Sequence, residues 1–150
     1  MSLSIFSDEH FMKKALQEAM DAYEDGEIPV GAVVVSEGKI IAKDHNRVEQ
    51  LQDATAHAEL LALTAAQNYL GSKYLKDCTL FVTLEPCAMC AGALFWTQVS
   101  RIVIGAPDKE RGFSRYDNTI IHPKTSLTSG IMEAETSGLL KRFFKEMRGN

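Results

Sequence analysis

The chain has 150 residues and a formal net charge of −4, and 45% of its residues are hydrophobic. This length and balance predict one globular domain over residues 1–150 and argue against a protein that coats nucleic acid nonspecifically. No apolar run reaches the roughly 18 residues of a membrane span, and the first residues lack the pattern of a secretory signal, so we expect a cytoplasmic protein with no membrane partner. In a reducing compartment, three cysteines favour metal binding or redox chemistry over a disulfide framework.

Apolar periodicity and turn residues predict an opening helix that begins after the N-cap Ser7 and stops at Gly26 and Pro29. The next segment is typical of a β-hairpin with its turn at Glu37 and Gly38. The predicted strands cover 30–35, 39–43, 78–84 and 101–106, and the later predicted helices cover 54–71, 86–98 and 131–148. Residues 105–129 show no clear period, so we expect a loop with short elements there.

The two central helices are expected to start in different ways. Asp53 or Thr55 is the predicted cap of the first helix, and Pro86 suits the first turn of the second. Because strands alternate with helices after the hairpin, the order favours an α/β fold in layers around a mixed sheet. Each central helix then begins where a strand or loop ends, and its N-terminus is free to build a site.

Two short motifs lie 30 residues apart: His57 and Glu59 in "HAEL", and Cys87 and Cys90 in "PCAMC". A single Cys is usually a packing residue, and a lone Cys-x-x-Cys in an α/β protein is also typical of a thioredoxin-like dithiol. A dithiol, however, does not require a His-x-Glu motif on another helix start. A metal site uses all four residues, and we therefore favour it.

The donor types indicate zinc, which binds imidazole nitrogen and thiolate sulfur in a tetrahedron. Cys87 and Cys90, three residues apart, face the same side of a helical turn whose N-terminus favours thiolate. With His57 as third ligand, one position stays open for a water molecule, whose pKa zinc lowers towards neutrality. Glu59 can reach this water without binding zinc and can pass its proton to a departing group, which is the chemistry of hydrolytic deamination.

Three neighbouring residues have simpler interpretations. Glu85, directly before the second motif, is more typical of a loop carboxylate that accepts hydrogen bonds from the backbone. Cys78 opens an apolar strand and is interpreted as a packing residue. His45 has no spacing that ties it to the metal ligands, although its position beside Asn46 leaves a role in a substrate pocket open.

These motifs resemble the H-x-E…P-C-x-x-C signature of the zinc-dependent nucleobase deaminases. The chain is similar over nearly its whole length to the bacterial tRNA-specific adenosine deaminases, and the similar segments are "GEIPVGAVVV" at 26–35, "HNR" at 45–47, "DATAHAE" at 53–59, "TLEPCAMCAGAL" at 83–94, "RIVIGAPD" at 101–108 and "LLKRFFKEMR" at 139–148. The resemblance implies a single deaminase domain, folded as a three-layer α/β/α sandwich with a central five-stranded mixed sheet, as in cytidine deaminases. It also implies a homodimer with one Zn²⁺ per subunit that converts adenosine to inosine at the wobble position of tRNA, with the anticodon stem-loop as partner.

Carried over by motif, the resemblance implies that His57, Cys87 and Cys90 hold the zinc and that Glu59 transfers protons. The implied substrate contacts are a base hydrogen bond from Asn46, a hold on the zinc-bound oxygen from the Ala58 backbone N–H, pocket walls from Pro29 and Val30, a nucleotide contact from Asp108, and anticodon-loop contacts from Phe143, Phe144, Lys145 and Arg148. An Asn side chain offers both a donor and an acceptor to a purine edge, and RNA bases are commonly splayed into apolar pockets. Taken alone, the paired phenylalanines are as typical of a core, and that alternative stays open for one of them.

One segment departs from the resemblance. Residues 109–125 read "KERGFSRYDNTIIHPKT", where the similar proteins have mostly small residues. Because this loop would border the substrate, a deaminase of a free nucleobase or nucleoside, such as guanine or cytosine, remains an alternative, and the acidic net charge also favours it. A third hypothesis is a structural zinc or RNA-binding module, but such a site has no use for Glu59 and normally closes its fourth ligand position.

Overall fold

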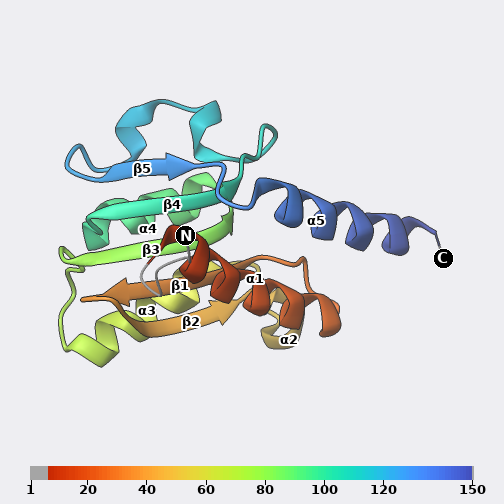
Figure 1. Cartoon of the computed structure of the whole chain (residues 1–150), viewed down its shortest axis with the longest axis horizontal. Coiled ribbons are helices and arrows are strands. Elements are labelled where there is room, and N and C mark those ends of the chain that lie inside the picture. Colours follow the sequence, from red (N-terminus) through yellow and green to blue (C-terminus); the bar gives the residue numbers. More distant parts are fainter. Residues whose placement is uncertain (1–6, 150) are drawn as a thin grey trace.

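The computed structural model describes residues 7–149, except for the side chain of Asn118. Within this range, five strands form one mixed sheet in the order β2–β1–β3–β4–β5. The strands are β1 (Gly31–Ser36), β2 (Lys39–His45), β3 (Cys78–Leu84), β4 (Arg101–Ala106) and β5 (Ser126–Ser129). The helices are α1 (Asp8–Glu24), α2 (Val48–Leu51), α3 (Ala58–Leu70), α4 (Ala88–Thr97) and α5 (Glu133–Arg148), and 3-10 turns lie at Phe113–Arg115 and Asn118–Ile120. Helices cover both faces of the sheet (Figure 1), which confirms the predicted α/β/α sandwich around a five-stranded mixed sheet.

The sheet combines a hairpin with parallel strands. β1 pairs antiparallel with β2 and with β3, whereas β3, β4 and β5 run parallel to one another. The hairpin turns at Glu37 and Gly38, whose φ angles of 52° and 74° are those that a type I′ turn requires. The parallel pair β3–β4 needs a crossover connection, and α4 provides it. The predicted hairpin is therefore confirmed, with β2 continuing to His45.

The core has two halves, one on each face of the sheet. Along β1, Ala32 and Val34 pack in the larger half with α3 and α4, whereas Val33 and Val35 pack in the smaller half with α1. This alternation follows the two-residue period of a strand. At the start of β1, a methyl group on Gly31 would overlap the backbone of α1, so the glycine lets α1 cross the sheet in direct contact.

Both central helices begin later than the sequence predicted. The N-cap of α3 is His57 rather than Asp53 or Thr55. The Oδ1 atom of Asp53 instead accepts hydrogen bonds from the backbone N–H and the hydroxyl of Thr55, at 2.9 and 2.7 Å, and closes a turn ahead of the helix. The N-cap of α4 is Cys87, so Pro86 precedes this helix and does not lie in its first turn.

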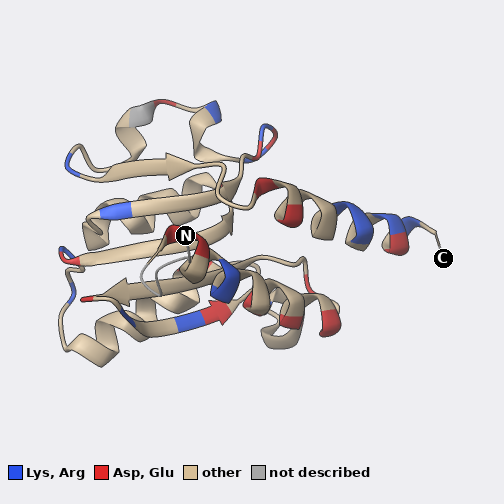
Figure 2. Ribbon diagram, in the orientation of Figure 1, with Lys and Arg blue, Asp and Glu red and all other residues tan. Residues whose placement is uncertain are grey.

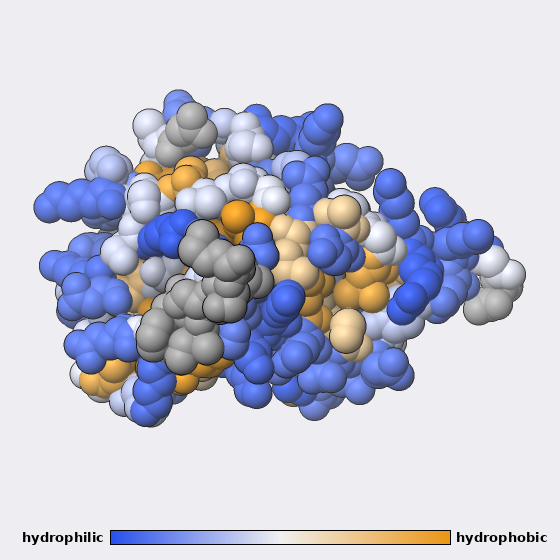
Figure 3. Space-filling view, in the orientation of Figure 1, coloured by the Kyte–Doolittle hydropathy of each residue, from blue (hydrophilic) through white to orange (hydrophobic). Residues whose placement is uncertain are grey.

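Helix α5 lies on the same face as α1 and extends beyond the sheet (Figure 1). It begins at Glu133, two residues later than predicted. Acidic residues lie at its start and basic residues near its end (Figure 2), an order that complements the helix dipole. Hydrophobic residues gather between α1 and α5 on the face shown in Figure 3. The rings of Tyr23 and Phe143 pack edge to face. Among the described residues, none of the helices is long and apolar enough to cross a membrane.

Candidate metal centre and active site

The predicted metal ligands meet at one end of the sheet. At this end β3 and β4 finish and β1 begins, and α3 and α4 start on the same face of the sheet. His57 is the N-cap of α3, Cys87 is the N-cap of α4, and Cys90 lies in the first turn of α4. The two helix starts therefore bring together side chains that are 30 residues apart in the sequence.

The donor atoms have the spacing of a tetrahedral zinc site. His57 Nδ1 lies 3.6 Å from Cys87 Sγ and 3.5 Å from Cys90 Sγ. A tetrahedron with Zn–N of about 2.0–2.1 Å and Zn–S of about 2.3 Å has N···S edges of about 3.5–3.6 Å. All three donor atoms lie within 4.8 Å of one another. The residues thus fit one zinc ion held through Nδ1, and His57 and Cys87 are only half-buried.

Hydrogen bonds within this cluster give the two thiols different acidities. The hydrogen bond with Cys90 lowers the pKa of Cys87 to about 3, and the same bond raises the pKa of Cys90 above its ordinary value. The hydrogen bond with Cys87 also raises the pKa of His57. These ligands therefore differ in how readily they lose a proton, and zinc binding favours the deprotonated form of each.

Glu59 is the second residue of α3 and is only 4% exposed. Burial raises the pKa of its carboxyl group to about 7, and the side chain hydrogen-bonds to Cys90 beside the cluster. A carboxyl group with a pKa near neutrality can both hold and release a proton at neutral pH. The arrangement therefore has the chemical capacity for proton transfer that the sequence motif indicated.

The side chain of Asn46 is already engaged on two sides. Its Oδ1 accepts a hydrogen bond of 2.9 Å from the Ala58 backbone N–H, and its Nδ2 donates one of 3.0 Å to the carbonyl of Ile28. The Ala58 N–H was expected to hold the zinc-bound oxygen. In the structure it donates to the Asn46 side chain instead. One N–H and one lone pair of Oδ1 remain on the Asn46 amide, so the expected use of both donor and acceptor stays a prediction.

The other predicted pocket residues adjoin this centre to different degrees. Pro29 and Val30 are buried, and the Val30 carbonyl accepts a 3.2 Å hydrogen bond from the Asn46 backbone N–H. Asp108 follows β4 at the same end of the sheet, where its Oδ1 accepts hydrogen bonds of 3.1 Å from the N–H groups of Glu110 and Arg111. Its carboxylate therefore shapes its own loop.

The two phenylalanines of α5 differ in burial. The sequence had left open that one of them is a core residue. Phe143 is 6% exposed and Phe144 is 43% exposed. The Phe143 ring packs against the Tyr23 ring, with 5.7 Å between centroids. The expected contact between Phe143 and RNA is therefore corrected to a core role, because its ring is covered by α1, whereas Phe144 remains accessible.

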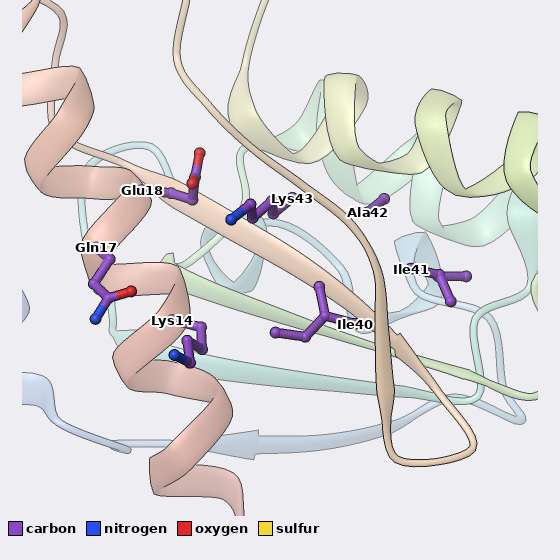
Figure 4. A pocket seen from close by; sticks show the side chains of 7 residues that line it. All are labelled: Lys14, Gln17, Glu18, Ile40, Ile41, Ala42 and Lys43. Atoms are coloured by element: carbon purple, nitrogen blue, oxygen red, sulfur yellow. The ribbon is translucent and has the colours of Figure 1, made fainter.

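A second group of polar residues lies away from the metal cluster. An open groove of about 410 Å³ separates α1 from β2 (Figure 4) and is lined by Lys14, Gln17, Glu18, Ile40, Ile41, Ala42 and Lys43.

Glu18 also lies near Asp44 and His45, but Arg47 already pairs with Asp44 at 2.6 Å. His45 Nδ1 lies 2.9 Å from the backbone carbonyl of Asn46. This contact holds the His45 ring against the backbone of Asn46.

Two buried carboxylates hold loops around the centre. Glu27, 2% exposed, accepts hydrogen bonds from the N–H groups of Glu49 and Gln50 at 3.0 and 2.8 Å, at the start of α2. Sequence reasoning missed Glu27 because no local spacing signals partners 22 and 23 residues away. Glu85 accepts hydrogen bonds from two backbone N–H groups, which confirms its interpretation as a loop carboxylate.

Comparison with known families agrees with this donor set. Residues 6–106 match the family described as the cytidine and deoxycytidylate deaminase zinc-binding region. A protein of Aquifex aeolicus named tRNA-specific adenosine deaminase is 46% identical over 147 residues, which are 95% of this chain and 97% of that protein.

Solved structures give the same result. A structure from a study of A-to-I editing by tRNA:A34 deaminases has a TM-score of 0.82 and 39% identity, and the match covers 87% of this chain and 99% of that one. A guanine deaminase from Nitrosomonas europaea has a TM-score of 0.81 and 28% identity, with 95% and 86% covered. The chain therefore belongs to the zinc-binding cytidine and deoxycytidylate deaminase family and, within it, to the tRNA-specific adenosine deaminases.

Proposed function

We propose that this protein hydrolyses adenosine to inosine at wobble position 34 of tRNA. The main support for tRNA as the substrate is the 46% identity, over 95% of the chain, to a protein named tRNA-specific adenosine deaminase. The chemistry is supported by the N···S spacings of 3.6 and 3.5 Å within the His57, Cys87 and Cys90 cluster.

The proposed reaction exchanges the exocyclic amino group of adenine for oxygen. A C–O bond forms at the amidine carbon, the C–N bond breaks, and ammonia leaves. When bound by His57, Cys87 and Cys90, zinc supplies Lewis acidity and an activated water molecule. The Glu59 carboxylate would accept a proton from the attacking water and deliver it to the ring nitrogen. It would then carry the second proton, from the new hydroxyl group, to the amino nitrogen that leaves as ammonia, and its pKa of about 7 suits both directions.

We propose that the free N–H of the Asn46 amide donates to the base and that Pro29 and Val30 form the wall of its pocket. Burial of both pocket residues and the hydrogen bond from Asn46 to Val30 support this role. Asp108 would contact the nucleotide from its loop, and Phe144 would offer an exposed ring to the bases of the anticodon loop. Lys145 and Arg148 in the last turn of α5 supply cations beside that ring.

The proposal extends to the assembly. We propose that residues 1–150 form one deaminase domain that works as a cytoplasmic homodimer on the anticodon stem-loop. Trp96 is 74% exposed and Met89 is 39% exposed, both on the metal-binding helix α4, and large apolar side chains of this kind are typical of an interface. Light scattering coupled to size exclusion will give twice the chain mass if this is right, and the mass of one chain if it is wrong.

The decisive experiment offers the protein an anticodon stem-loop with adenosine at the wobble position, alongside free guanine, cytosine, adenosine and cytidine. We expect inosine in the stem-loop and no ammonia from the free compounds. Rising salt should lower the activity, because phosphate contacts release counterions. Ammonia from guanine alone would favour the second candidate, a free-base deaminase. The similarity to the Nitrosomonas europaea guanine deaminase is the observation that supports this candidate.

A further inference from the structure

Glu85 is a buried carboxylate that the proposed reaction does not use. It is 6% exposed and lies between the end of β3 and the start of α4. Its Oε1 accepts a 3.1 Å hydrogen bond from the Asp108 N–H, and its Oε2 accepts a 2.8 Å bond from the Ser114 N–H. One side chain therefore ties both ends of the segment 108–114 to the chain directly before the metal-binding helix.

The same segment also contacts the metal-binding turn through its backbone. Gly112 forms an antiparallel bridge with Cys87, and the Phe113 N–H donates a 2.9 Å hydrogen bond to the carbonyl of Pro86. A methyl group on Gly112 would overlap the Glu85 carboxylate and the carbonyl of Asp108. Glu85, the loop and the backbone of Cys87 therefore form one packed unit.

The loop 108–115 held in this way carries three cations and the carboxylates of Asp108 and Glu110. Lys109, Arg111 and Arg115 are all exposed, and Arg115 Nη1 donates a 2.6 Å hydrogen bond to the carbonyl of Glu110 within the loop. Exposed guanidinium and ammonium groups bind phosphate oxygens well. Because Gly112 bridges to Cys87, these cations are carried on a loop anchored at the metal centre.

We propose that Glu85 is a positioning residue that fixes the loop 108–115 beside the metal centre, so that the exposed cations of this loop meet the phosphates of the RNA substrate. This inference rests on the proposed function for the identity of the substrate, but the positioning itself does not. The carboxylate is required because two backbone N–H groups need two acceptor oxygens. A glutamine offers one oxygen and turns an NH₂ group towards the other donor.

The test compares Glu85→Gln with Glu110→Gln, a control in the same loop whose side chain is exposed. In the zinc-loaded protein, we expect hydrogen exchange at the amides of Asp108 and Ser114 to become roughly tenfold faster in Glu85→Gln only, as for a lost charge-assisted hydrogen bond. With the stem-loop, KM should rise roughly tenfold while kcat stays within about twofold, which is the pattern of lost uniform binding. The salt dependence of KM should also weaken, because fewer phosphate contacts remain.

A second variant approaches the same contact from the loop. Gly112→Ala leaves Glu85 in place but pushes on its carboxylate, and it should reproduce the faster exchange and the higher KM. Unchanged exchange at both amides, equal effects in Glu110→Gln, or a fall in kcat at constant KM would overturn the proposal. So would loss of zinc or of folding in both variants, which would make Glu85 a general stability element. Because exchange needs no substrate, a stem-loop that yields no inosine would refute the proposed function and leave the positioning test intact.

Discussion

Replacing Asn46 by Ala separates the structural role of this side chain from its proposed contact with the base. The change removes the acceptor of the Ala58 N–H at 2.9 Å and the donor to the Ile28 carbonyl at 3.0 Å. Ala58 is the first residue of α3 and is fully buried, so its N–H has no acceptor within the helix and is shielded from water.

The size of the effect follows from these two losses. A buried donor left without a partner costs about 1–3 kcal/mol, whereas the Ile28 carbonyl keeps its 2.9 Å hydrogen bond from the Val30 N–H, so the loss of its second donor costs about 1 kcal/mol. We therefore expect the free energy of unfolding to fall by about 2–4 kcal/mol. For a chain of this length, that corresponds to a fall in Tm of about 5–15 °C.

Urea denaturation of the zinc-loaded protein, followed by circular dichroism, measures this change. The matched control is Asn68→Ala, an exposed position on α3, which should stay within about 0.5 kcal/mol of the parent. Asn46→Asp keeps an acceptor for Ala58 but places a second oxygen against the Ile28 carbonyl, so it removes the second bond and adds repulsion. If Asn46→Ala is as stable as its control, both hydrogen bonds are absent in solution and the reasoning about Asn46 fails.

Three further outcomes are expected. Glu59→Gln should lower turnover by about 10²–10⁴-fold while zinc stays near one per chain, and turnover at the parent rate would contradict its role in proton transfer. Cys90→Ser should lower the zinc content and shift the chelator concentration needed to remove zinc at least about tenfold, because metal affinity depends on the thiolate; an unchanged content, measured by mass spectrometry, would rule out Cys90 as a ligand. Asp8→Asn should cost about 0.5–1 kcal/mol, because Arg101 binds both Asp8 oxygens at 2.8 and 2.7 Å in a pair about one third exposed. That cost should shrink in high salt, and a cost that does not depend on salt would point to packing instead.

The sequence predicted the elements whose pattern repeats and missed those held by single distant contacts. The alternating valines of β1 and the Glu37–Gly38 turn determine the hairpin locally. In contrast, β5 has one apolar residue in four, Leu127, and is a strand because it pairs with β4. Likewise α2 has four residues, and its first N–H groups are held by Glu27 from more than twenty residues away.

The site was predictable where spacing determines geometry. His57, Cys87 and Cys90 could be grouped from the sequence because each of the two motifs starts a helix. The partners of the Ala58 N–H and of Glu85 could not be found in this way, since they depend on how loops return to the helix starts. Phe143 and Phe144 are adjacent in the sequence, and only the packing of α5 on α1 separates the buried ring from the exposed one.

The two helix starts at the metal centre have a consequence for how the protein responds to loss of its metal. His57 and Cys87 occupy N-cap positions, yet neither side chain makes a capping hydrogen bond to the described backbone. A good cap stabilises a helix by about 0.5–2 kcal/mol, and at α3 the Asn46 side chain supplies one by accepting from the Ala58 N–H. Zinc bound by His57 and Cys87 would connect the starts of α3 and α4. We therefore expect removal of zinc to loosen this end of the molecule first, which faster proteolysis near the starts of α3 and α4 would reveal.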